Sequence, residues 1–181
     1  EELSCYKRII QELISIHKIK GEDYKGTPFF KRSFDHEKLM FEVDFTIEHL
    51  IKGLFEGIST EEQVNLIRAE FEKIIFDIEN QDRVLTHRDF HSRNIMMKNG
   101  EIKIIDFQDM RMGTPQYDLT SLLEDCYYRV HENNKEELKK FYWNEAKEAK
   151  VTNQDYDTFL NQYDKMAIQR TFKALGSFAY I

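Results

Sequence analysis

The chain has 181 residues, of which 41% are hydrophobic and 33% charged, and its formal net charge is −7. This size suits one hydrophobic core, and the balance is typical of a globular protein rather than a disordered one. The negative charge argues against nucleic acid as a partner, and no apolar run approaches the roughly 20 residues that span a membrane. Cys5 and Cys126 follow no paired spacing, which favours a reducing, cytoplasmic compartment.

Apolar residues recur at helical spacing through most of the chain. They predict helices over residues 2–19, 36–54, 59–78, 119–127, 134–149 and 156–174. Ser59 and Glu62 predict a capping box at the start of the third helix. Near the middle the period changes to that of strands, with residues 95–97 and 102–104 flanking Asn99-Gly100. Because this dipeptide is a strong hairpin signal, we predict a mainly α (α+β) fold, with residues 1–181 forming one unit around a small central β-hairpin.

Three polar residues around this hairpin point to a kinase. Asp89 lies on a loop and can accept the proton of an attacking hydroxyl. Asn94 begins the first strand and Asp106 follows the second, so a tight hairpin places both at the same open end. Their amide and carboxylate oxygens are donors that Mg²⁺ prefers. The spacing therefore predicts one base, Asp89, and two magnesium ligands, Asn94 and Asp106.

Other interpretations of these residues are open. An isolated Asp or Asn on a loop usually caps a turn or a helix. His87, Asp89 and His91 alternate as transition-metal ligands on a strand can, but no other histidine is close by in sequence. We favour a supporting role for His87 and His91, in which their rings hold the loop by hydrogen bonds to backbone groups.

Three further polar residues have less certain roles. Asp118 stands at the start of a predicted helix and is interpreted as an N-cap that braces the catalytic loop at most. Asp109, three residues after Asp106, faces either the acceptor substrate or water. Arg93 adjoins a magnesium ligand and either meets a phosphate oxygen or, the favoured choice, pairs with a surface acid.

Residues 87–94, His-Arg-Asp-Phe-His-Ser-Arg-Asn, resemble the catalytic loop of the aminoglycoside phosphotransferase superfamily, which has a protein-kinase-like fold. Residues 105–109, 117–123 and 169–176 are most similar to predicted cell-wall sugar kinases. Those enzymes phosphorylate the anomeric hydroxyl of N-acetylmuramate or N-acetylglucosamine. The resemblance implies that Asp89 is the catalytic base, that Asn94 and Asp106 bind Mg²⁺, and that ATP is the donor. It also implies a small-molecule acceptor, with an amino sugar favoured, and a substrate-facing position for Asp109.

The family's nucleotide-binding lobe has a glycine-rich loop, and none of the seven glycines here forms one. We therefore expect a C-terminal lobe alone, with the N-terminal lobe missing from this chain. Such a lobe is expected to be inactive by itself, since nothing fixes the β- and γ-phosphates. Two alternatives stay open: a non-catalytic binding or regulatory module derived from a kinase lobe, and an aminoglycoside or choline kinase.

Overall fold

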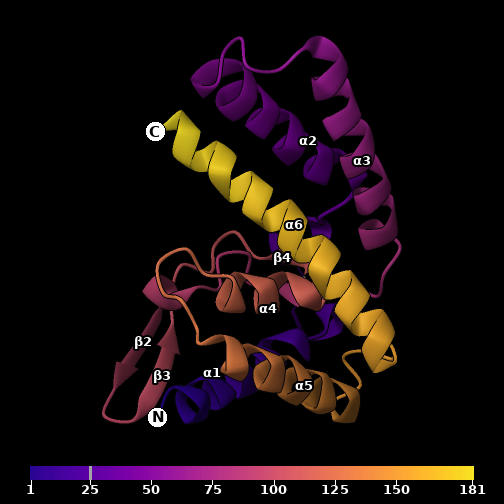
Figure 1. The fold of residues 1–181 in the computed structure, drawn as a ribbon. Helices are drawn as coiled ribbons and strands as arrows, with labels where there is room; N and C mark the ends of the chain where they lie inside the picture. Colours follow the sequence, from indigo (N-terminus) through magenta and orange to yellow (C-terminus); the bar gives the residue numbers. More distant parts are fainter. Residues whose placement is uncertain (25) are drawn as a thin grey trace.

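Figure 1 shows the computed structural model of the chain, which describes residues 1–24 and 26–181. Long helices dominate, and the strands are short. The elements in chain order are α1 (Glu2–His17), η1 (Gly21–Tyr24), η2 (Pro28–Lys31), α2 (His36–Thr46), η3 (Ile47–Leu54), α3 (Glu61–Glu79), β1 (Val84–Thr86), η4 (Ser92–Asn94), β2 (Ile95–Lys98), β3 (Glu101–Ile104), β4 (Arg111–Gly113), α4 (Gln116–Leu123), α5 (Glu132–Glu148) and α6 (Tyr156–Tyr180). The predicted fold class, mainly helical with a small β-hairpin, is confirmed.

The helices form two groups, and α6 crosses diagonally from one to the other (Figure 1). In the first group α1, α4 and α5 pack around one hydrophobic core, to which α6 contributes Phe159 and Tyr163. In the second group α2 and α3 form another core with Met166 of α6. No helix among the described residues has both the length and the apolar content needed to cross a membrane. Because α6 belongs to both cores, its side chains lie between the two groups.

The hairpin forms where the sequence predicts it. Strands β2 and β3 pair antiparallel, with Ile95 opposite Ile104 and Lys98 opposite Glu101. Asn99 and Gly100 form the turn with φ values of 52° and 78°, the left-handed conformation that this dipeptide tolerates. The register places the residue before Ile95 beside the residues after Ile104, which brings the predicted magnesium ligands to one end.

A second, smaller sheet was not predicted. Strand β1 pairs antiparallel with β4, and Val84 lies opposite Gly113. A Cβ atom on Gly113 would lie 3.0 Å from side-chain atoms of Phe34 and Thr86, so the strands meet where only a glycine fits easily. This pairing places the loop that follows β1 next to the start of α4. Strands of three residues carry too little alternation to be predicted from sequence.

Several predicted helix boundaries differ from the structure. The capping box of α3 is formed by Thr60 and Gln63, not by Ser59 and Glu62. The predicted helix over 36–54 becomes a wider π-helix at Ile47, where bonding from i to i+5 shifts the helical period. Leu54, the last residue of the predicted helix, is 64% exposed.

The other two differences have tertiary causes. Helix α4 stops at Leu123 rather than continuing to residue 127, because the Asp125 side chain accepts the N–H groups of Ser92 and Tyr127 at 2.8 Å each. Helix α6 continues to Tyr180 rather than ending at residue 174. It packs closely against α2 at Gly176, where a Cβ atom would lie 2.7 Å from Thr46 Cα. This contact extends the helix beyond the predicted pattern.

Candidate active site

The catalytic loop is held by a buried carboxylate on α4. Asp118 Oδ2 accepts the main-chain N–H of His87 at 2.6 Å, and Oδ1 accepts that of Arg88 at 2.9 Å. Arg88 has a φ of 83°, a conformation that costs energy for a residue with a side chain. The two bonds from Asp118 offset this cost and direct the chain toward Asp89.

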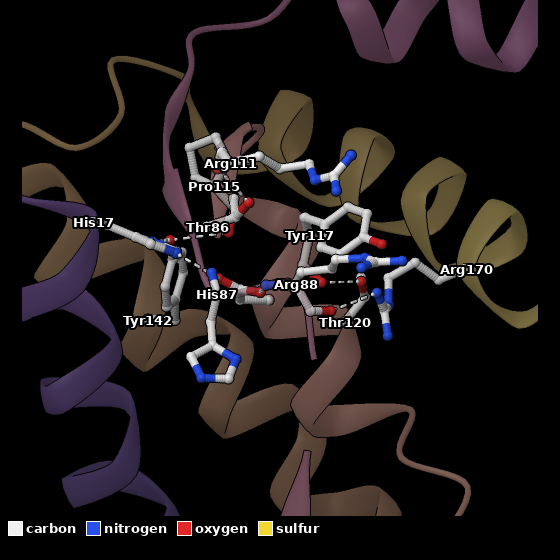
Figure 2. Close-up of polar contacts among 11 residues, drawn as sticks. His17, Thr86, His87, Arg88, Arg111, Pro115, Tyr117, Thr120, Tyr142 and Arg170 are labelled. Atoms are coloured by element: carbon white, nitrogen blue, oxygen red, sulfur yellow. Dashed lines mark hydrogen bonds and ion pairs between the residues drawn. The ribbon is translucent and has the colours of Figure 1, made fainter. Parts of the chain in front are cut away.

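Asp118 is also joined to two other helices. Its Oδ2 atom lies 3.3 Å from His17 Nε2 on α1, and His17 Nδ1 lies 2.7 Å from the Tyr142 hydroxyl on α5. That hydroxyl also lies 3.1 Å from the carbonyl oxygen of Pro115, and burial raises its pKa. Figure 2 shows these side chains converging on the loop. The N-cap prediction for Asp118 is wrong, since Pro115 occupies that position without a side-chain cap, but the bracing contact itself is present.

The proposed base lies on a loop with a well-defined shape. The main-chain carbonyl of Asp89 accepts the N–H of His91 at 3.1 Å and the side-chain amide of Asn94 at 2.9 Å. The next residue, Phe90, is fully buried and anchors the loop in the first core. The Asp89 residue itself is partly exposed. The loop therefore holds Asp89 by its backbone at a position that is partly open to solvent.

The two predicted magnesium ligands lie together. Asn94 is buried, and its Nδ2 atom lies 3.4 Å from Asp106 Oδ2. The carbonyl oxygen of Asn94 accepts the N–H of Ile105 at 3.0 Å, which continues the β2–β3 pairing up to Asp106. Asp106 has a φ of 69°, which turns the chain away from the strand. Since Asn94 Nδ2 is bonded to the loop, its amide oxygen and the Asp106 carboxylate are the groups that would hold a hard cation here.

The histidines of the loop do not act as predicted. Both ring nitrogens of His87 are buried and have no hydrogen-bond partner in residues 1–24 and 26–181, and the same holds for His91 Nδ1. The His87 ring packs edge-on against Phe90, and the His91 ring packs against Tyr127, 5.2 Å between centroids. Burial lowers the pKa of His91. The two rings therefore support the loop by packing rather than by hydrogen bonds to the backbone.

The alternation of His87, Asp89 and His91 does not produce a transition-metal site. Across the described part of the chain, no three His, Cys, Asp or Glu side chains converge as metal donors. The predicted magnesium pair differs from such a cluster, because one of its two members is an amide.

Asp109 and Arg93 have contacts that the sequence left open. Asp109 Oδ2 accepts a hydrogen bond from Arg88 Nη1 at 2.7 Å, and Oδ1 lies 3.8 Å from Arg32 Nη1. Asp109 thus orients the arginine next to the base. Arg93 stacks its guanidinium 3.9 Å from the Tyr127 ring centroid and forms no ion pair with an acid among the described residues, so the favoured surface pair is wrong.

Sequence reasoning missed two residues that contact the loop. Asp125 accepts the N–H of Ser92, and Arg170 Nη1 of α6 donates to the carbonyl oxygen of Arg88 at 3.2 Å. Figure 2 shows Arg170 beside Arg88 and Tyr117. From the sequence, residues 169–176 show only a similarity to the sugar kinases, and no contact with the loop is predicted for them. The sequence signal for Arg170 would have been a cationic residue on a helical face that is otherwise buried.

Comparisons with known proteins identify the family of the chain. The family described as "Phosphotransferase enzyme family" matches residues 4–149. The chain belongs to this family. The predicted resemblance to aminoglycoside phosphotransferases is confirmed, and with it the protein-kinase-like fold.

Similar relatives are named as sugar kinases. The N-acetylmuramate/N-acetylglucosamine kinase of Neisseria meningitidis serogroup B is 30% identical over 171 residues, which cover 94% of this chain and 49% of that protein. The enzyme of the same name from Pseudomonas aeruginosa is 34% identical over 102 residues, covering 56% of this chain and 30% of the relative. The chain therefore spans about half the length of the first of these relatives.

A solved structure shows the same fold. The crystal structure of aminoglycoside-3'-phosphotransferase of type VIII superposes with a TM-score of 0.53 at 16% identity, covering 91% of this chain and 61% of that one. At this identity the similarity establishes the fold and leaves the acceptor to the site's own chemistry.

Proposed function

We propose that this chain is the catalytic C-terminal lobe of an ATP- and Mg²⁺-dependent kinase that phosphorylates a hydroxyl of an amino sugar. The main support is the placement of Asn94 and Asp106 beside the loop of Asp89, at the end of the hairpin. Asn94 Nδ2 lies 3.4 Å from Asp106 Oδ2 there. The names of the relatives support the amino sugar as acceptor. The reaction belongs in the cytoplasm, where ATP is present and the free Cys5 and Cys126 stay reduced.

In the proposed reaction, the oxygen of the acceptor hydroxyl attacks the γ-phosphorus of ATP. The Asp89 carboxylate takes the proton of that hydroxyl. One P–O bond forms to the acceptor, and the P–O bond to ADP breaks. Asn94 and Asp106 hold Mg²⁺, which, when bound, neutralises charge on the phosphates and the leaving ADP. Asp118 and Asp109 fix the loop on either side of Asp89, so the base is oriented before the substrate binds.

We further propose that the β- and γ-phosphates of ATP are bound by a second lobe of the natural protein, outside these 181 residues. The half-length match to the Neisseria relative supports this, as does the lack of a glycine-rich loop in the sequence. Purified residues 1–181 are then expected to show only background turnover.

The test is an assay of the full-length natural protein with ATP, Mg²⁺ and either N-acetylmuramate or N-acetylglucosamine. Asp89→Asn should lower kcat by about 100-fold or more, because a positioned base contributes about that much, while leaving thermal stability unchanged. Asp82→Asn, a substitution at an exposed acid before β1, is the matched control. Turnover of Asp89→Asn within about tenfold of wild type would remove Asp89 from the role of base. Absence of turnover on any amino sugar, aminoglycoside or choline would favour a binding module.

A further inference from the structure

Two cations of α6 lie beside the catalytic loop. Arg170 donates to the carbonyl oxygen of Arg88, one residue before the proposed base, and its guanidinium lies 4.4 Å from the Tyr117 ring centroid (Figure 2). Lys173 follows Arg170 by three residues on the same helix, so both side chains project from one face. Both are partly exposed, which leaves them within reach of a ligand.

Arg170 and Lys173 lack ion-pair partners within 4.0 Å among the described residues. Like charges three residues apart on a helix repel each other, and partial burial strengthens the repulsion. Burial is the main cause that lowers the pKa of Lys173, and the charge of Arg170 is the second. The charges of Glu42 and Asp89 act in the opposite direction, and neither carboxylate forms an ion pair with Lys173.

Two of the neighbouring acids, Glu42 and Asp109, already have other partners. Glu42 Oε2 accepts a hydrogen bond from Gln169 at 3.1 Å, and Oε1 lies 3.6 Å from Lys38. Asp109 is bonded to Arg88. Nearby, Gln169 Oε1, Tyr117 Oη and Arg88 Nε are buried without a hydrogen-bond partner among the described residues. Two cations without an ion-pair partner among the described residues therefore lie near several buried polar atoms that are incompletely satisfied.

We propose that Arg170 and Lys173 bind a carboxylate of the acceptor, so that the preferred substrate is an acidic sugar. This inference rests on the proposed function and narrows it. Of the two sugars in the relatives' names, N-acetylmuramate carries a carboxylate at neutral pH and N-acetylglucosamine does not. A polycationic aminoglycoside would meet repulsion at this position, which argues against that class of acceptor.

The test compares kcat/KM for the two sugars in the full-length natural protein at saturating ATP. Lys173→Met should lower kcat/KM for N-acetylmuramate by about tenfold to 100-fold through a higher KM, since a charge-assisted hydrogen bond is lost. The value for N-acetylglucosamine and the KM for ATP should stay within about twofold. Lys173→Arg should restore most of the preference. Lys165→Met, on the same helix but paired with Asp77, is the control and should change neither sugar.

A substrate analogue gives a second measurement that needs no variant. Conversion of the N-acetylmuramate carboxylate to its amide should reduce wild-type kcat/KM to about the level of N-acetylglucosamine. Equal losses on both sugars, a raised KM for ATP, or equal turnover of the acid and the amide would each overturn the carboxylate site. These results leave the sugar kinase itself intact, whereas a wild-type protein that phosphorylates neither sugar contradicts the proposed function instead.

Discussion

The two sides of the catalytic loop are built in different ways. On the metal side, Asn94 bonds to the carbonyl of Asp89, five residues away, and lies near Asp106, 12 residues away. On the bracing side, Asp118 forms a hydrogen bond to His87, 31 residues earlier, and Arg170 forms one to Arg88, 82 residues earlier. Local contacts need only a hairpin, whereas distant ones require the whole core to be in place. The metal side should therefore control chemistry, and the bracing side should control both chemistry and stability.

The largest expected effect is on the metal side. Asp106→Asn should lower kcat of the full-length natural protein by about 100-fold or more, because it removes the only anionic ligand of the proposed magnesium pair. Asn tolerates the positive φ of this position, and the side chain is exposed, so the midpoint of urea unfolding should change little. Gln108→Ala, which removes only the hydrogen bond to Asp106, is the control. A full rate at ordinary Mg²⁺ would show that the hairpin end does not hold the metal.

The bracing side should respond differently. Asp118→Ala leaves the buried N–H groups of His87 and Arg88 without an acceptor and leaves His17 without its partner. The free energy of unfolding should fall by about 3 kcal/mol, and activity should fall with it. Asp118→Asn, which keeps one acceptor oxygen, should lose less. If Asp118→Ala unfolds at the same urea concentration as Asp106→Asn, the contrast between the two sides is wrong.

The smallest effect concerns Arg93. Its stacking on the exposed Tyr127 ring should be worth less than about 1 kcal/mol, so Arg93→Ala should hardly change the unfolding midpoint. Turnover should stay within about threefold, because in this structure the guanidinium is directed to Tyr127. A tenfold or larger rise in the KM for ATP would instead show that Arg93 leaves the ring to meet a phosphate oxygen. Arg129→Ala, at a nearby exposed position, serves as the control.

The sequence predicts best where a signal is local. The helical spacing and the Asn99-Gly100 turn each involve contiguous residues, and the corresponding helices and hairpin are present in the structure. The joint placement of Asn94 and Asp106 follows from that turn, so it too was predictable. Helix ends were less so. The end of α4 depends on the hydrogen bond that the Asp125 side chain accepts from the N–H of Ser92, 33 residues earlier.

The roles of the supporting residues could not be read from the chain. Asp118 has the residue type of an N-cap and begins a predicted helix, but in the structure it lies within the first turn of α4 and bonds to the loop that follows β1. The His87 ring was expected to form hydrogen bonds, yet both its nitrogens are buried without a partner among the described residues and the ring packs against Phe90. Arg170 and Lys173 sit in an ordinary amphipathic helix. Their location beside Asp89 depends on the crossing of α6 between the two helical groups.

Residues 84–106 alone are thus enough to predict the proposed base, the proposed metal pair and the hairpin that joins them, because each of these depends on neighbours within about one hairpin of sequence. The tertiary structure decides which buried carboxylate fixes the loop, which cations stand beside the base and what charge an acceptor meets there. Those features arise from contacts across 30 to 101 residues. The same local sequence pattern is compatible with many tertiary arrangements. Close packing of both cores around α6 favours one of these arrangements.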